Sequence, residues 1–250
     1  MRMSGRNWRG WFLVAVTAAG IAAAFWFSPI PQDPAYHEFA DRRTMFGTPN
    51  FWNVYSNLPF VLVGAFGLSQ LSGLQPSSPR SAYVVFCIGV VLVGFGSAYY
   101  HFSPSTQALA WDRLPLTVVF MALFSMVVRD RMSEQFGDGM LWPLVLAGAA
   151  SVGYWHWSEL QGRGDLRAYA LIQFLPLLLI PLLLALCSGK GLRAPWLWGM
   201  LGTYALAKVA EHYDEVIFAA TAAVSGHSIK HLLASLAVLW AVFAVLRSSR

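Results

Sequence analysis

Charged residues are scarce in this sequence. Asp, Glu, Lys and Arg make up 12% of its 250 residues, whereas 57% of the residues are hydrophobic. A soluble domain carries about 25% charged residues. The composition therefore excludes an ordinary soluble protein, because too few charges are present to cover a water-facing surface.

Cysteine is also scarce, and this limits the chemistry of the chain. Cys87 and Cys187 each lie inside an apolar run and have no ligand-like neighbours. We therefore interpret both as small buried hydrophobes rather than as a disulfide or a metal site. Internal repeats, low-complexity tracts and the short alternating segments of a transmembrane β-barrel are absent from the sequence as well.

The sequence is instead rich in long apolar runs. A helix needs about 20 mainly apolar residues to cross the hydrocarbon core, and lipid offers no partner for an unpaired backbone group. We therefore expect an all-α, polytopic membrane protein. The runs predict eight spans, at Trp11–Phe27, Phe51–Leu71, Ala82–Phe102, Trp111–Val128, Met140–Trp157, Ala168–Cys187, Trp196–His212 and His227–Leu246.

The net charge of +5 is distributed unevenly over the predicted loops. It is interpreted as a topology signal and a contact with anionic lipid, not as a nucleic-acid-binding surface. With the N-terminus inside, the cytoplasmic ends would hold Arg2, Arg6, Arg9, Arg80, Arg129, Arg131, Lys190, Arg193, Arg247 and Arg250. The opposite side would hold Arg42, Arg43, Arg113, Arg163, Arg167 and Lys230. This bias predicts that both termini are cytoplasmic, which requires an even number of spans.

Residues 1–30 are predicted to form a transmembrane anchor helix in front of a domain at 31–250. Arginines precede its apolar run, as in a signal sequence, and Ala22–Ala24 is a candidate cleavage site. The apolar run continues past these alanines to Phe27. This continuation favours an anchor that is not cleaved.

Five polar residues lie within or at the ends of predicted spans, where insertion costs on the order of 3 kcal/mol for a charged group. They are Ser97, His101, Asp112, His227 and His231. Ser97 and His101 are four residues apart, as are the last two histidines, so each pair shares one helix face. In the predicted topology, Asp112 and the three histidines all fall at outward helix ends.

This spacing predicts a metal site. Two histidines four residues apart can coordinate one metal ion from a single helix face. Three histidines with a fourth position open to water form a catalytic zinc site rather than a structural one. Haem ligation by the histidine pair and simple interfacial helix caps are the alternatives. A transporter is disfavoured, because no inverted repeat or pair of broken spans is present.

Three motifs resemble the alkaline ceramidase family, within the wider group of seven-helix membrane hydrolases that includes the progestin-and-adiponectin receptors. The first motif is Asn50–Phe60, NFWNVYSNLPF. The second is Gly96–His101, GSAYYH, followed by Asp112–Pro115, DRLP, with the family's eleven-residue spacing from histidine to aspartate. The third is His227–His231, HSIKH.

The resemblance implies a seven-helix hydrolase core, to which the N-terminal helix is an addition. The three histidines, His101, His227 and His231, would hold zinc (Zn2+). Ser97 would donate a hydrogen bond to the oxyanion that develops on the attacked carbonyl. Asp112 would take a proton from the attacking water and pass it toward the leaving amine.

Calcium (Ca2+) is a second cofactor of the eukaryotic members of this family. They bind it through an acidic residue just before the first motif and an acidic cluster upstream. Here Asn50 precedes the motif, and Glu38 and Asp41 lie upstream, so hard oxygen ligands are still available. The favoured interpretation is that Asp41 pairs with Arg42 or Arg43 on a solvated loop.

Other polar groups are interpreted as structural. Asn53, Ser56 and Asn57 are expected to form hydrogen bonds across helices. Lys208 and Glu211 are three residues apart and are expected to neutralise each other. The carboxylates of Asp214–Glu215 are candidates for orienting a ligating imidazole.

The resemblance implies a zinc-dependent hydrolase that cleaves the amide bond of ceramide or a related N-acyl lipid. The active site would face the extracytoplasmic side of a membrane, and the short loops are typical of a bacterial cytoplasmic membrane protein. The alternative is a non-hydrolytic, receptor-like or lipid-binding member of the same superfamily. Ser97 and Asp112 argue against this alternative, because a pure binding site needs neither an oxyanion donor nor a base.

Overall fold

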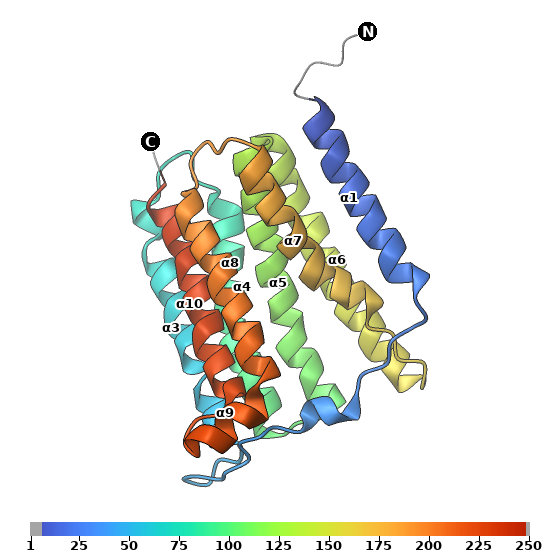
Figure 1. Ribbon diagram of the computed structural model, residues 1–250. Coiled ribbons are helices and arrows are strands. Elements are labelled where there is room, and N and C mark those ends of the chain that lie inside the picture. The colour runs from blue at the N-terminus through green and yellow to red at the C-terminus, as the bar shows by residue number, and fades with distance from the viewer. Residues whose placement is uncertain (1–6, 249–250) are drawn as a thin grey trace.

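The computed structural model describes residues 7–248, which form a bundle of helices (Figure 1). The α-helices are α1 Asn7–Trp26, α2 Phe51–Tyr55, α3 Leu58–Ser69, α4 Arg80–Phe102, α5 Thr106–Arg131, α6 Glu134–Leu160, α7 Arg167–Leu186, α8 Ala194–His212, α9 Asp214–Thr221 and α10 Gly226–Leu246. Two short 3-10 helices are η1 Pro34–His37 and η2 Leu71–Gly73. Over residues 7–248 there is no strand beyond an isolated bridge between Met45 and Thr48. The predicted all-α class is confirmed.

Each of the eight predicted apolar runs is helical, but the second run is divided into α2 and α3. The division falls at Ser56 and Asn57, and Pro59 stands in the first turn of α3. Proline is tolerated there, because the first turn has no intrahelical partner for the missing N–H. The short helix α9 was not predicted. It ends at Ala222, whose φ of 51° is left-handed.

Six segments are long and apolar enough to cross a membrane: α1, the α2–α3 pair, α4, α5, α7 and α10. The chain is therefore a multi-pass membrane protein. Helices α6 and α8 are not among these six. Helix α6 carries Glu134 and Glu159 at its two ends, and α8 carries Lys208 and Glu211. The count of eight spans stays a prediction.

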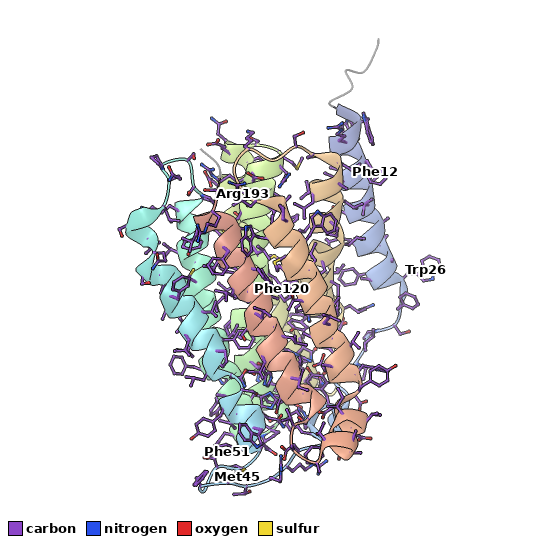
Figure 2. All side chains as sticks on the ribbon, turned by 60° about the vertical axis from the view of Figure 1, so that its left-hand side comes forward. Phe12, Trp26, Met45, Phe51, Phe120 and Arg193 are labelled. Carbon is purple, nitrogen blue, oxygen red and sulfur yellow. The ribbon has the colours of Figure 1, made fainter. Side chains whose placement is uncertain are left out.

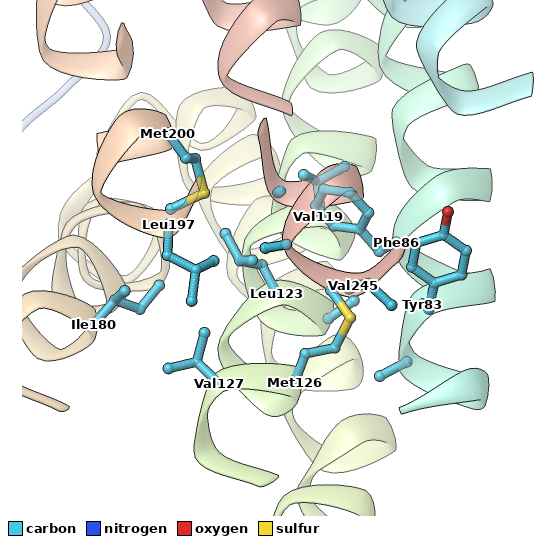
Figure 3. Close-up of a cluster of buried hydrophobic side chains, with 14 of the residues drawn as sticks. Tyr83, Phe86, Val119, Leu123, Met126, Val127, Ile180, Leu197, Met200 and Val245 are labelled. Carbon is cyan, nitrogen blue, oxygen red and sulfur yellow. The ribbon is translucent and has the colours of Figure 1, made fainter. Parts of the chain in front are cut away.

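Helix α5 lies at the centre of the bundle, since most of its apolar stretch is buried. Figure 3 shows part of the core around it, where Met126 and Val127 of α5 belong to one buried cluster with Leu197 of α8 and Val245 of α10. The outer surface is also apolar. On α1, which packs against α7, Phe12 is 42% exposed and Trp26 is 88% exposed (Figure 2). Exposed apolar side chains of this size suit a lipid-facing surface.

The candidate site residues predicted from the sequence lie at one end of the bundle. Helix α4 ends there, and α5 and α10 begin there, at the lower end in Figure 1. The segment 27–50 runs across this end, whereas α1 begins and α10 ends at the opposite end (Figure 1). The fold therefore brings the last turn of α4 next to the first turns of α5 and α10.

Candidate metal centre

The three predicted histidines come together in the structure. His101 lies in the last turn of α4, while His227 and His231 lie in the first turns of α10. Their candidate ligand atoms all lie within 4.8 Å of one another. Within residues 7–248 this is the one group of three or more His, Cys, Asp or Glu side chains close enough to hold a metal ion. All three imidazoles are buried.

The ring nitrogens are oriented as a shared ion requires. Nε2 of His101 and Nε2 of His227 lie 3.3 Å apart. Two ligands of a tetrahedral zinc at ~2.05 Å would be separated by about the same distance. The Lys230 ammonium lies 2.9 Å from His227 Nε2. Because an ammonium can only donate, this Nε2 carries its lone pair rather than a proton, and a metal would take that lone pair in place of the Lys230 hydrogen bond.

A second contact fixes the orientation of His231. Its Nδ1 lies 2.7 Å from the Ser56 hydroxyl, which stands at the break between α2 and α3. Nearby, Asn53 Oδ1 accepts a hydrogen bond of 2.9 Å from Ser228. The expected cross-helix hydrogen bonds of the first motif are thus present for Asn53 and Ser56, whereas the Asn57 amide bonds the Asn53 carbonyl of its own segment. Spacing within the motif could not reveal that the Ser56 hydroxyl reaches a histidine of the cluster.

Replacing Ser56 with alanine should weaken metal binding by about 10- to 100-fold, because the hydrogen bond that holds the His231 ring would be lost. The measurement is zinc affinity by competition with a chromogenic chelator. Ser69→Ala is the matched control, since the Ser69 hydroxyl is exposed and bonds only near neighbours in the sequence, the Phe66 carbonyl and the Gln70 amide. Equal zinc affinities for the two variants would contradict a supporting role for Ser56.

Asp214 supports the start of α10 rather than an imidazole. Its carboxylate accepts hydrogen bonds from the backbone N–H of His227 at 2.7 Å and of Ala40 at 3.0 Å. Gly226 comes just before His227, at a point where an added Cβ would collide with backbone atoms of Ala210 and Asp214. The close approach of α8, α9 and α10 therefore sets the position of the histidine pair.

The segment 27–50 covers the histidines from the end of the bundle. Phe39 packs its ring against His101 and His227, with ring centroids 4.6 and 4.8 Å away. In the same segment, burial and the nearby charge of Arg113 lower the pKa of His37 below its usual value. His37 bonds the hydroxyls of Tyr100 and Thr106. The neutral imidazole of His37 therefore helps to hold the segment 27–50 over the histidine cluster.

Asp41, a candidate calcium ligand, pairs with an arginine in the structure. Both oxygens of the Asp41 carboxylate accept hydrogen bonds from Arg43, at 2.8 and 2.7 Å. Arg43 also donates to the backbone carbonyls of Ala222 and Ala223. Burial raises the pKa of Asp41, but the hydrogen bonds and charge of Arg43 lower it by more, so it lies below its usual value. The favoured pairing with arginine is confirmed, although Asp41 is buried rather than solvated.

A cavity of about 260 Å³ opens beside the histidine cluster. Ser97, Asp112 and His231 all line it, so the structure brings together the predicted serine, aspartate and metal site. Apolar side chains from α4, α7 and α10 form much of its wall. The cavity thus combines an apolar lining with a few converging polar groups, as in sites for small molecules and cofactors.

A charged group that sequence reasoning missed also lines this cavity. Lys230 donates to Glu211 Oε1 at 3.0 Å, and Lys208 pairs with the other oxygen of the same carboxylate. The predicted pair of Lys208 and Glu211 is therefore present, extended by Lys230. The spacing within α8 could reveal only that pair, because Lys230 comes from α10.

The fold and the site define a class: a multi-pass helical membrane protein with a buried three-histidine centre, next to which a serine and an aspartate line a cavity. The sequence model of the ceramidase family matches residues 48–207. The chain belongs to this family. The match covers the first two motifs, whereas His227 and His231 lie beyond it and are tied to the site by their geometry. No match was found among curated proteins.

Proposed function

We propose that this protein is a zinc-dependent hydrolase of the amide bond of ceramide or a related N-acyl lipid. The observation that carries the proposal is the convergence of Ser97, Asp112 and His231 on one cavity, in a chain of the ceramidase family. Membership of this family supports hydrolysis of an amide. The histidine cluster supports a metal-assisted route to it.

Zinc fits the donor set. Three neutral imidazoles are typical ligands of catalytic zinc, and a fourth position stays free for a water molecule or the substrate. Zinc, when bound, acidifies water and polarises a carbonyl. His101, His227 and His231 would hold it, and Ser56 would keep the ring of His231 in place.

Asp112 and Ser97 would carry out the proton transfer and the stabilisation of charge. Asp112 takes a proton from the attacking water and delivers it to the nitrogen of the leaving amine, as a general base and then a general acid. Ser97 donates a hydrogen bond from its hydroxyl to the carbonyl oxygen as negative charge develops there. Both side chains are held on long helices, α5 and α4, which preorganises them for these roles.

The substrate would be a lipid that enters from the bilayer. The cavity lies among membrane-spanning helices, and Phe60, Val93 and Phe174 contribute to its apolar wall. An amide at headgroup depth would meet the metal, while the acyl chain stays among apolar side chains. We place both termini in the cytoplasm and the site toward the extracytoplasmic side of a bacterial cytoplasmic membrane. The basic residues of the loops favour this orientation.

The test is hydrolysis by the purified, zinc-loaded protein in proteoliposomes. Fatty acid should be released from ceramide or another N-acyl lipid, prolonged chelation should abolish the release, and added zinc should restore it. The measurement is mass spectrometry of the released acid, with an ester-linked lipid of the same chain length as control. A zinc-loaded protein that binds these lipids but leaves every amide intact would favour the receptor-like alternative.

A further inference from the structure

Arg113 occupies an unusual position in the cavity. It follows Asp112 directly on α5, and both residues line the cavity. Its side chain is only 5% exposed. Since successive helix residues are rotated by about 100°, Arg113 lies to one side of the predicted proton-transfer group.

The guanidinium is surrounded by aromatic rings. Its centre lies 4.1 Å from the ring of Trp155, 4.7 Å from that of Tyr169 and 5.7 Å from that of Tyr36. Nη2 donates to Gln32 Oε1 at 2.6 Å. Aromatic faces attract a cation, but they do not replace hydrogen-bond acceptors in the plane of the guanidinium.

The charge of Arg113 has no direct partner in the described part of the chain. Its Nη1 is buried and has no hydrogen-bond acceptor there. Other arginines differ: Arg131 and Arg167 each pair with a carboxylate within 3 Å. A buried, unpaired guanidinium is costly, and its planar fork matches the two oxygens of a carboxylate or phosphate.

The other charges that line the cavity form no ion pair with Arg113. Lys208 and Lys230 share the carboxylate of Glu211, so this group already carries more positive than negative charge. Asp112 is the remaining carboxylate, and it would lose its charge when it takes up a proton in the proposed reaction. An anionic substrate group would supply the missing partner.

We propose that Arg113 forms an anion subsite, so that the preferred substrate is an N-acyl lipid whose head carries a carboxylate or a phosphate. The inference rests on the proposed function, because it specifies the substrate of the same cavity. The anionic group sits against the free edge of the guanidinium, the aromatic rings hold the guanidinium in place, and the amide faces Ser97 and Asp112. A neutral head leaves Nη1 without an acceptor.

The first test compares three lipids with the same palmitoyl chain: N-palmitoylglycine, ceramide 1-phosphate and neutral ceramide. With full-length, zinc-loaded protein in neutral detergent, kcat/KM for at least one anionic lipid should exceed that for ceramide by about 10-fold or more. The lipid with the higher value identifies carboxylate or phosphate as the preferred anion. A ratio near one for both anionic lipids would overturn the proposal.

Substitutions then assign the preference to Arg113. Arg113→Gln should lower the anionic-to-neutral ratio of kcat/KM by about 10- to 100-fold. Arg113→Lys keeps the positive charge but not the planar set of N–H donors, so it should retain part of the anionic-to-neutral ratio of kcat/KM. This variant replaces Arg113→Gln in the test if the glutamine variant does not fold. The control is Arg163→Gln, an exposed arginine in the loop between α6 and α7, which should keep the full ratio. A wild-type ratio in both Arg113 variants would overturn the proposal.

A binding experiment separates this inference from the proposed function. N-(hexadecylsulfonyl)glycine and its methyl ester differ in one negative charge and contain no hydrolysable amide. The acid should bind wild-type protein about 10-fold more tightly than the ester, and Arg113→Gln should remove this difference. If no lipid is hydrolysed but this difference is seen, the subsite stands and the hydrolase does not. If lipids are hydrolysed but acid and ester bind equally, the subsite is wrong and the hydrolase stands.

Discussion

Replacing His231 with alanine is expected to leave the purified protein without zinc and to reduce lipid hydrolysis to background. Wild-type protein should carry about one zinc per chain. His231 is buried at the histidine cluster, and its Nδ1 is held by Ser56. With two imidazoles remaining, the site would lose one of its three fixed ligands, and no other His, Cys, Asp or Glu in residues 7–248 joins the group.

Elemental analysis of detergent-purified protein measures this effect directly. His156→Ala is the matched control, because His156 lies on α6 and is not a member of the cluster. The control should keep its zinc and its activity. Folded wild-type protein without zinc, or a His231→Ala variant with a full complement, would show that the three histidines do not form the metal centre.

The Asp112→Asn variant should keep its zinc but lose about 100- to 10,000-fold in kcat, which is the usual contribution of a positioned general base. Asparagine has nearly the same size, so the cavity wall should stay intact while the proton acceptor is lost. Asp112 is not one of the clustered histidine ligands, which is why metal content is expected to be unchanged. The loss should appear in kcat rather than in lipid binding.

The control for this variant is Asp138→Asn. Asp138 lies near the start of α6, where its carboxylate is half exposed and pairs with Arg129. The Asp138→Asn variant should hydrolyse lipid at the wild-type rate, and its zinc content is measured in parallel. If Asp112→Asn were equally active, a different group would have to accept the proton. If it lost both zinc and activity, Asp112 would be supporting the metal rather than moving the proton.

Local sequence patterns were sufficient for the long helices and for the histidine cluster, but not for α9 or for the break between α2 and α3. Long apolar runs determine where helices form in a membrane, because every backbone group must be paired within its own segment. The four-residue spacing of His227 and His231 places both on one helix face. That His101 joins them followed from the predicted topology, which set all three at one end of the bundle.

Contacts between distant segments were not predictable in the same way. Ser56 and His231 are 175 residues apart, and their contact depends on how α2 packs against α10. Lys230 reaches Glu211 of α8 for the same reason. Arg43, the partner of Asp41, donates to the carbonyls of Ala222 and Ala223 just after α9, a helix too short and too polar at its start for its sequence to predict. Residue spacing predicts which side chains share a face of one helix, whereas these contacts depend on how different helices pack against each other.

The distribution of the histidines also sets the order in which the protein can mature. A chain that is still being synthesised presents His101 when α4 inserts, but the other two ligands arrive only with α10, after every other helix that surrounds the site. Bound metal cannot stabilise the earlier stages, because binding energy contributes only once the ligand set is complete. The contacts among α4, α5 and α6 must hold the nascent bundle together without it. Metal uptake at the proposed centre would then be a late step of biogenesis, and it would distinguish chains whose α10 has docked from those in which it has not.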